Sequence, residues 1–308
     1  MTRLAQALKR SASPDSPLSE VATAVVEPAL AEATAAPILN FAEPLLRVAE
    51  PAEDHRLFAR DPVKVGEPHM HAPHLHDFSD RLARKLVTDP ESRPGAVEQY
   101  RRLAAALHHA QAQSGIKVVM VTSAVVAEGK SLSVCNLGLT LSHSYRMRVL
   151  LIDGDLRRPS LQEMFKLPPT GGLSEGLRND DSCELPLYEV SPGLVVLPAG
   201  RPDADPVGSL TSGRIGRALA EAAADFDWVL IDTPPLGLVP DAALLGSLAD
   251  TVLLVVRAGV SPCALVRQAI ETLGTDKIFG VLLNAVDNSG VAKSGGYSYE
   301  YSPRVPRR

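Results

Sequence analysis

Between residues 117 and 284, short apolar runs alternate with longer segments in which apolar residues recur at helical spacing. The runs predict strands and the longer segments predict helices, because the two patterns follow the periods of those structures. Strands are predicted at residues 117–122, 148–153, 194–198, 228–232, 251–256 and 279–284. Helices are predicted at residues 131–144, 211–224, 240–249 and 262–273, preceded by an amphipathic helix from Glu98.

The predicted strands VLLID, WVLID and TVLLVV are almost continuously apolar. This composition is typical of a parallel sheet whose two faces are both covered by helices. The alternation of strands and helices therefore predicts a single α/β domain over about residues 91–290, with a mostly parallel sheet.

Residues 1–90 have a different pattern, rich in Ala, Pro, Ser and Glu, with prolines too closely spaced for long helices. Such a segment buries too little apolar surface to offset its ordering entropy, so we expect it to be largely disordered. Within it, four histidines are close together, which is compatible with a metal site. A solvated linker is the favoured interpretation, because nothing preorganises the ligands. These histidines are His69, His71, His74 and His76.

The chain has 308 residues and a net charge of -5, so no overall positive field attracts nucleic acid, and no nucleic-acid partner is expected. Cys135, Cys183 and Cys263 match no zinc or CxxC pattern and are typical of reduced thiols. The longest apolar runs, such as 251–256, are far shorter than the ~20 residues that span a bilayer. We therefore expect a soluble cytoplasmic protein, in which any membrane role must come through a partner.

Candidate chemistry begins where the first predicted strand ends, in the sequence TSAVVAEGKS. The stretch from Ala124 to Ser131 fits the relaxed form of a phosphate-binding loop between a strand and a helix. In such a loop, backbone N–H groups and the helix N-terminus bind phosphate, Lys130 would reach the β- and γ-oxygens, and Ser131 would bind Mg²⁺. The alternative is an ordinary strand-to-helix turn with a solvated lysine.

Acidic residues end two later strands. Asp153 and Asp155 follow VLLI, with Arg157 two residues further on, and Asp232 ends WVLID. The carboxyl ends of parallel strands share one edge with the loop, so these carboxylates should face the same crevice. They would hold Mg²⁺ through water, and one would accept the proton of an incoming hydroxyl. Each aspartate alone could also be a turn or cap residue, but the combination favours nucleotide binding.

These motifs resemble those of the bacterial tyrosine kinases of capsule and exopolysaccharide synthesis, within the ParA/MinD-like P-loop ATPases. The resemblance covers about residues 85–301 and includes TSAVVAEGKS, LLIDGDLRRPSL, VLIDTPP and GVLLNAVD. It implies a P-loop NTPase fold that uses ATP and Mg²⁺, with Lys130, Asp153, Asp155 and Asp232 as catalytic residues. The metal would be held by Ser131 with the three aspartates. The nucleotide-binding residues that the resemblance implies are Ala124, Ala127, Glu128, Gly129, Lys130, Ser131, Leu132, Arg157 and, at the adenine base, Asn284.

The loop departs from the kinase family's pattern at Ala127 and Leu132, and from that of ParA- and MinD-like ATPases at Val125. Ala127 replaces a glycine, which costs on the order of 1 kcal/mol if the backbone there has a positive φ, and we expect weaker binding in consequence. Leu132 lacks a hydroxyl that would contact the α-phosphate, a loss of about 0.5–1.5 kcal/mol. Val125 stands where ParA- and MinD-like ATPases carry a second lysine, which disfavours a partitioning or positioning role.

The last residues, 291–308, form a predicted flexible tail that contains three closely spaced tyrosines. The resemblance implies that Tyr297, Tyr299 and Tyr301 are phosphorylated by a neighbouring subunit; a merely disordered aromatic tail is the alternative. It also implies a homo-oligomer, a membrane polysaccharide co-polymerase as partner and a cognate phosphotyrosine phosphatase. Glu98 and Arg101 fit the family's oligomerisation pattern, whereas its third position is Ala104.

Two functions other than the kinase are compatible with these sequence features. One is an ATP-binding regulatory or scaffold subunit with little phosphoryl transfer, motivated by Ala127 and Leu132. The other is a ParA/MinD-like ATPase, which Val125 and the tyrosine tail disfavour.

Overall fold

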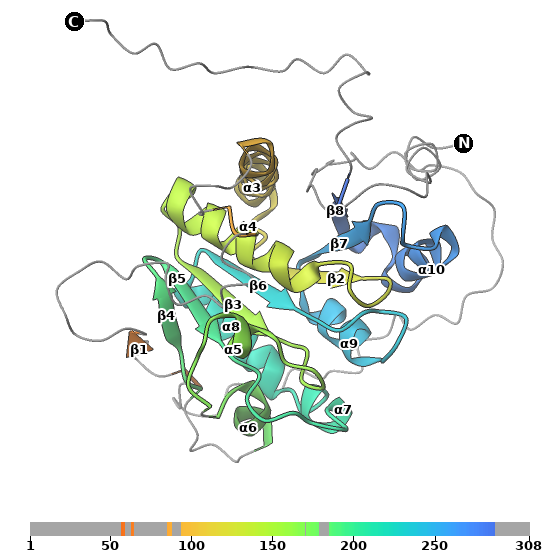
Figure 1. Ribbon diagram of the computed structural model, residues 1–308. Helices are drawn as coiled ribbons and strands as arrows, with labels where there is room; N and C mark the ends of the chain where they lie inside the picture. Colours follow the sequence, from red (N-terminus) through yellow and green to blue (C-terminus); the bar gives the residue numbers. More distant parts are fainter. Residues whose placement is uncertain are drawn as a thin grey trace, which may run out of the picture.

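The computed structural model describes residues 57–58, 63–64, 85–87, 94–169, 171–178 and 185–286. Within them an eight-stranded sheet has the order β1-β4-β5-β3-β6-β2-β7-β8 (Figure 1). Neighbouring strands are parallel except β4 and β5. The strands are β1 (Val63–Lys64), β2 (Val118–Ser123), β3 (Val149–Asp153), β4 (Tyr188–Ser191), β5 (Leu194–Leu197), β6 (Trp228–Asp232), β7 (Thr251–Arg257) and β8 (Ile278–Asn284).

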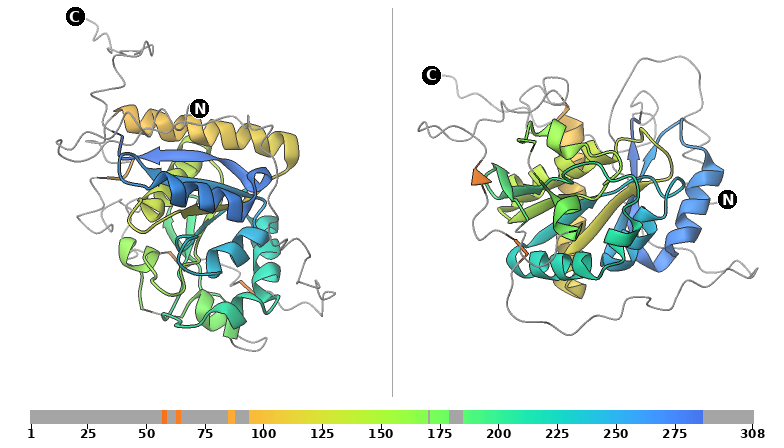
Figure 2. Two further views of the ribbon diagram at one scale, coloured as in Figure 1. Left: turned by 90° about the vertical axis from the view of Figure 1, so that its right-hand side faces the viewer. Right: turned by 90° about the horizontal axis from the view of Figure 1, so that it is seen from below.

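Helices cover both faces of this sheet (Figure 2). On one face, α3 and α4 pack on strand residues such as Leu151 and Leu230. On the other, α8 and α9 pack on the alternate residues, such as Leu150 and Val229, and α10 packs on Leu254. The longer helices are α3 (Pro94–Ser114), α4 (Lys130–Tyr145), α8 (Arg214–Asp225), α9 (Asp241–Leu248) and α10 (Cys263–Leu273). Short helical turns are α5 (Leu161–Met164), α6 (Leu173–Arg178), α7 (Val207–Leu210) and η2 (Thr275–Lys277).

The predicted α/β architecture, a mostly parallel sheet between two helical layers, is confirmed. Each predicted strand lies within about one residue of an observed one. The helix expected from Glu98 begins earlier, at Pro94, which suits the first turn because proline has no N–H to leave unpaired there. The helix expected over 211–224 begins later, at Arg214, after the separate turn α7. The pattern missed β4 and α5 to α7, because each is too short to show a period.

The N-terminal segment, expected to be disordered, contributes three short stretches to the structure. Leu57, Phe58 and Leu86 are buried, and β1 pairs with β4. The large apolar side chains that the domain covers therefore lie in the first and third of these stretches. The histidine cluster, Cys183 and the tail tyrosines lie outside the described residues. Cys135 and Cys263 are free thiols. Among the helices that the structure describes, none has the length and apolar character needed to cross a bilayer.

Candidate nucleotide-binding site

The loop between β2 and α4 has the backbone of a phosphate-binding loop. Gly129, which precedes α4, has φ 92°, and Ala127 has φ 61°. Ala127 therefore has the positive φ at which alanine costs on the order of 1 kcal/mol relative to glycine. Lys130 is the first residue of α4, so the N–H groups of this helix's first turn open onto the loop.

Glu128 fastens the loop from inside. Its buried carboxylate accepts hydrogen bonds from the N–H of Val125 at 2.9 Å and from the hydroxyl of Ser261, in the loop after β7. Its backbone carbonyl accepts a bond from Asn284 Nδ2 at 2.8 Å, at the end of β8. A Cβ at position 129 would collide with this same Asn284 amide, so glycine is required there. Glu128 and Asn284 thus fix the loop against the neighbouring strand ends.

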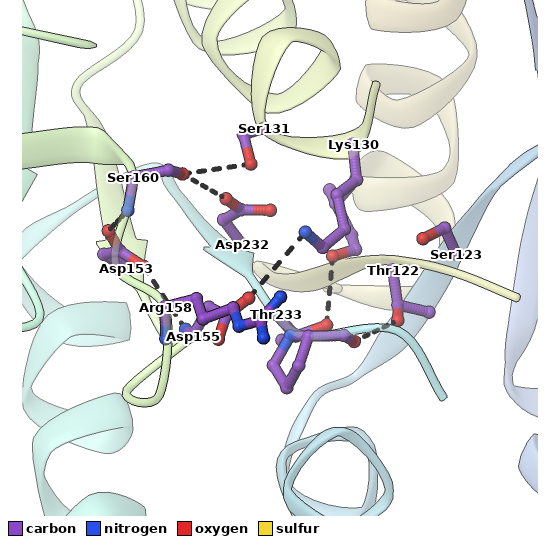
Figure 3. A network of polar contacts seen from close by, with 12 residues as sticks. Thr122, Ser123, Lys130, Ser131, Asp153, Asp155, Arg158, Ser160, Asp232 and Thr233 are labelled. Atoms are coloured by element: carbon purple, nitrogen blue, oxygen red, sulfur yellow. Dashed lines mark hydrogen bonds and ion pairs between the residues drawn. The ribbon is translucent and has the colours of Figure 1, made fainter. Parts of the chain in front are cut away.

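Asp153 and Asp232 end adjacent strands and are direct register partners in the sheet. Both side chains are fully buried. Oδ2 of Asp153 accepts the backbone N–H groups of Ser160 at 2.8 Å and Leu161 at 2.9 Å, and its Oδ1 accepts that of Asp155 at 3.2 Å. Asp153 is therefore held by backbone donors, which orient the turn that follows β3 (Figure 3).

Ser160 connects the loop serine with the carboxylate of β6. Its hydroxyl lies 3.1 Å from Ser131 Oγ and 3.4 Å from Asp232 Oδ2 (Figure 3). The other carboxylate oxygen of Asp232 is buried and accepts no hydrogen bond from the described residues. Sequence reasoning did not single out Ser160. The available signal was its place in LLIDGDLRRPSL, directly before the turn α5.

Lys130 points toward the acidic residues (Figure 3). Its Nζ lies 3.8 Å from Asp155 Oδ2, and the two side chains are 16% and 9% exposed. Burial raises the pKa of Asp155, and the Lys130 ammonium acts against that rise. Burial, together with the charge of Asp232, raises the pKa of Asp153 to about 7. Burial raises the pKa of Asp232, and Lys130 and Ser131 act against that rise.

Three residues predicted to contact nucleotide have other partners here. Arg157 donates to both oxygens of Asp241, at 2.7 and 3.2 Å, and to the carbonyl of Ala204. Its guanidinium therefore ties the turn after β3 to α9 rather than to the loop. Leu132 packs against the core on the α3–α4 face, and Ala124 is buried beside α10.

The arrangement fits a magnesium ion that depends on phosphate ligands. No group of three His, Cys, Asp or Glu side chains in the described part of the chain is placed to hold a metal alone. Mg²⁺ usually binds one or two protein oxygens, several waters and substrate phosphates, so a closed cage is not needed. Ser131 Oγ and the unpartnered Oδ1 of Asp232, whose Oδ2 contacts Ser160, supply oxygen donors of that kind.

The chain is similar in sequence to known proteins. The chain is 33% identical over 220 residues to the tyrosine-protein kinase YwqD of Bacillus subtilis (strain 168), covering 70% of this chain and 92% of that protein. It is 33% identical over 199 residues to the tyrosine-protein kinase CpsD of Streptococcus agalactiae, covering 62% and 84%. The chain belongs to the bacterial tyrosine kinase family. This confirms the family that the motifs indicated.

Other family members are longer or have solved structures. The match to the tyrosine-protein kinase wzc of Salmonella typhimurium, at 34% identity, covers 67% of this chain but only 29% of that protein. The kinase domain of Escherichia coli tyrosine kinase ETK superposes with a TM-score of 0.59 at 31% identity, covering 68% of this chain and 80% of that one. The BceF tyrosine kinase domain gives 0.56 at 34% identity, covering 62% and 78%. These likenesses confirm the kinase-type P-loop fold. No family model matches the chain.

Proposed function

We propose that this bacterial tyrosine kinase transfers the γ-phosphate of ATP, with Mg²⁺, to tyrosines in the tail of a neighbouring subunit. The observation that carries the proposal is one polar network at the carboxyl edge of the sheet. It joins Ser131, Ser160 and Asp232, and beside it Lys130 faces Asp155. The relatives named as tyrosine-protein kinases support this reaction over other uses of a P-loop.

The nucleotide would be held mainly by backbone groups. The loop N–H groups and the first turn of α4 would bind the phosphates, with Lys130 at the β- and γ-oxygens. Asn284, whose amide already contacts the loop at Glu128, would lie at the adenine side. Ser131 and Asp232 would hold Mg²⁺, which when bound neutralises charge that develops on the transferred phosphoryl group.

The base that accepts the phenol proton is better assigned to Asp155 than to Asp153. Asp153 accepts three backbone N–H groups, which occupy most of its acceptor sites. Asp155 accepts one such bond, from Arg158, and its other oxygen faces Lys130. Burial raises the pKa of Asp155, which makes its carboxylate a stronger base than a solvated one. Asp153 then positions the turn that carries Asp155.

The substrates and partners follow from the family. We assign phosphate acceptance to Tyr297, Tyr299 and Tyr301, which lie outside the described residues. A membrane polysaccharide co-polymerase would recruit the kinase from the cytoplasm to the inner membrane face, and a phosphotyrosine phosphatase would reset the tail. A relative named a succinoglycan biosynthesis transport protein, 34% identical over 219 residues, supports a role in polysaccharide synthesis or export.

The test is an anti-phosphotyrosine blot of the full chain with ATP and Mg²⁺, alone and co-expressed with its membrane partner. We expect signal in the wild type, and none in Lys130→Met or in the triple variant of Tyr297, Tyr299 and Tyr301 to Phe. Lys166→Met, at an exposed lysine outside the site, is the matched control and should keep the signal. An unchanged signal in Lys130→Met would show that the phosphate comes from another kinase.

A second candidate is an ATP-binding regulatory subunit with little phosphoryl transfer. The observation in its favour is the altered loop, with Ala127 in a left-handed conformation and Leu132 packed into the core. Nucleotide binding without phosphotyrosine, even with the membrane partner present, would select this function. A ParA/MinD-like ATPase, disfavoured by Val125, would instead show lipid- or DNA-stimulated hydrolysis.

A further inference from the structure

Two short N-terminal stretches, residues 57–58 and 63–64, lie on the side of the domain at the edge of the sheet. We call these two stretches the arm. The backbone N–H groups of Leu57 and Phe58 donate to the two oxygens of Glu221 on α8, at 2.9 and 3.4 Å. The N–H of Leu185 donates to the Leu57 carbonyl at 2.6 Å. One carboxylate thus holds two consecutive amides, as charge-assisted hydrogen bonds.

The arm is also bound through its side chains. Leu57 is 8% exposed and Phe58 is 3% exposed, although the arm lies more than 30 positions before the first helix of the domain. Both belong to the apolar cluster that includes Leu177 and Leu185. The groove is therefore defined by Glu221 for the backbone and by this cluster for the side chains. It recognises an extended Leu-Phe segment in the manner of strand addition to a sheet edge.

Further along, the arm extends the sheet. Val63 and Lys64 pair in parallel with Tyr188 and Glu189 of β4, which is otherwise the edge strand (Figure 1). The sequence around β4, LPLYEVS, is apolar and β-prone, the kind of edge that proteins cover. The arm supplies that cover in two residues, so the groove and β4 form one continuous docking surface.

The connection to the rest of the chain does not restrict the arm to its own domain. Twenty residues, 65–84, separate the arm from Lys85, whose carbonyl accepts a bond from Asn136 on α4 at 3.2 Å. Twenty extended residues reach up to ~70 Å, more than the diameter of a domain of this size. An arm anchored at Lys85 can therefore enter the groove of an adjacent copy and make the same contacts there.

We propose that this groove is an interaction surface for a second copy of the chain, whose arm exchanges with the resident one. Exchange of identical elements is a low-cost route to association, because every contact broken within one copy is remade between two. The proposal rests on the arm, Glu221 and β4, and does not depend on nucleotide binding or phosphoryl transfer.

The experiment uses two full-length variants with different dyes. Phe58→Asp has a defective arm and an intact groove, whereas Glu221→Ala has an intact arm and a weakened groove. Mixed together, they restore one sound arm–groove pair between copies. We expect the mixture to associate about tenfold more tightly than either variant alone. Each variant alone lacks either the charge-assisted hydrogen bonds to Glu221 or the buried ring of Phe58, and the mixture restores both in one pair. Energy transfer between the dyes and sedimentation measure this association.

Two controls keep the result interpretable. Phe58→Asp mixed with the double variant, Phe58→Asp with Glu221→Ala, has no sound arm and should show no gain. Glu271→Ala, at an exposed glutamate on α10, should behave as wild type. Hydrogen exchange at Leu185 checks release of the resident arm in each variant. The mixture could associate no more tightly than the control that has no sound arm, while hydrogen exchange at Leu185 confirms that the resident arm is released. That result would show that the arm docks only within its own chain, and it would overturn the proposal. Slow hydrogen exchange at the Leu185 N–H in both single variants would also overturn the proposal.

Discussion

At position 127 an alanine has a left-handed backbone conformation, with φ 61°. We expect the loop to keep this conformation with and without nucleotide, so that the strain lowers the stability of the fold rather than the affinity for nucleotide. Ala127→Gly should raise the free energy of unfolding by about 0.5–1 kcal/mol and leave nucleotide affinity almost unchanged. Denaturant unfolding and calorimetric titration of the two proteins measure these quantities.

Arg146 provides a matched control for this substitution. It caps the end of α4 with φ 57°, another left-handed position, away from the loop. Arg146→Gly should give a similar gain in stability. A gain at position 146 without one at position 127, accompanied by tighter nucleotide binding in Ala127→Gly, would mean that the free loop relaxes and adopts this conformation only with ligand.

Asp153 makes the stability of the nucleotide-free protein depend on pH. Its folded pKa, about 7, lies above the value for an unfolded aspartate, so the folded state binds more protons between these values. Its favourable contribution is complete below pH ~4 and is lost as the pH rises through about 7. Relative to Asp153→Asn, the wild type should lose up to about 1.4 kcal/mol of stability per pH unit from pH 5 to 7. Unfolding in urea with a chelator measures the difference, and a constant difference would contradict the raised pKa.

The chemistry of single residues was more visible in the sequence than their contacts. Lys130, Ser131 and the three aspartates could be proposed from motifs, because loop and strand-end spacings are local. Arg157 was expected at the nucleotide, yet it pairs with Asp241, which is 84 positions away in the chain. Ser160 was not predicted because its contact is also distant in sequence: its hydroxyl meets Asp232 only because β3 and β6 are neighbours in the sheet.

Among the secondary-structure elements, α3 packs through one line of buried side chains against α4, the helix that follows the phosphate-binding loop. Tyr100, Leu103 and Leu107 recur at helical spacing, and all are buried in the core that α4 shares. Leu103→Ala should therefore lower the free energy of unfolding by about 2–5 kcal/mol. Arg102→Ala, at its exposed neighbour, should change it by no more than about 0.5 kcal/mol. Equal losses in denaturant unfolding would mean that α3 is not packed on α4.

Long elements were predictable and short ones were not. β2, β3, β6 and β7 are mostly apolar because both faces of the sheet are covered, and this pattern is visible in the sequence. β4 has a mixed pattern at the edge, and β1 has two residues. Both depend on partners outside their own segment, so local periodicity could not reveal them.

For the whole molecule, tail phosphorylation should control assembly. Each phosphate adds about -1.5 to -2 charges at neutral pH, so a phosphorylated tail repels neighbouring subunits. We expect smaller assemblies by sedimentation after incubation with ATP and Mg²⁺. The triple variant of Tyr297, Tyr299 and Tyr301 to Phe should keep its assembly size under the same conditions. If the assembly size changes equally in both proteins when nucleotide is added, the change comes from nucleotide binding and not from tail phosphorylation.

The central claim is that Lys130 and Ser131, facing the acids that end β3 and β6, bind Mg·ATP. Calorimetric titration of the full chain with Mg·ATP up to millimolar concentration tests it most directly, with Lys130→Met and Lys166→Met alongside. The account predicts saturable heat for the wild type and Lys166→Met that disappears in Lys130→Met while the fold is retained. Heat of equal size in Lys130→Met, or none in the wild type, would contradict it.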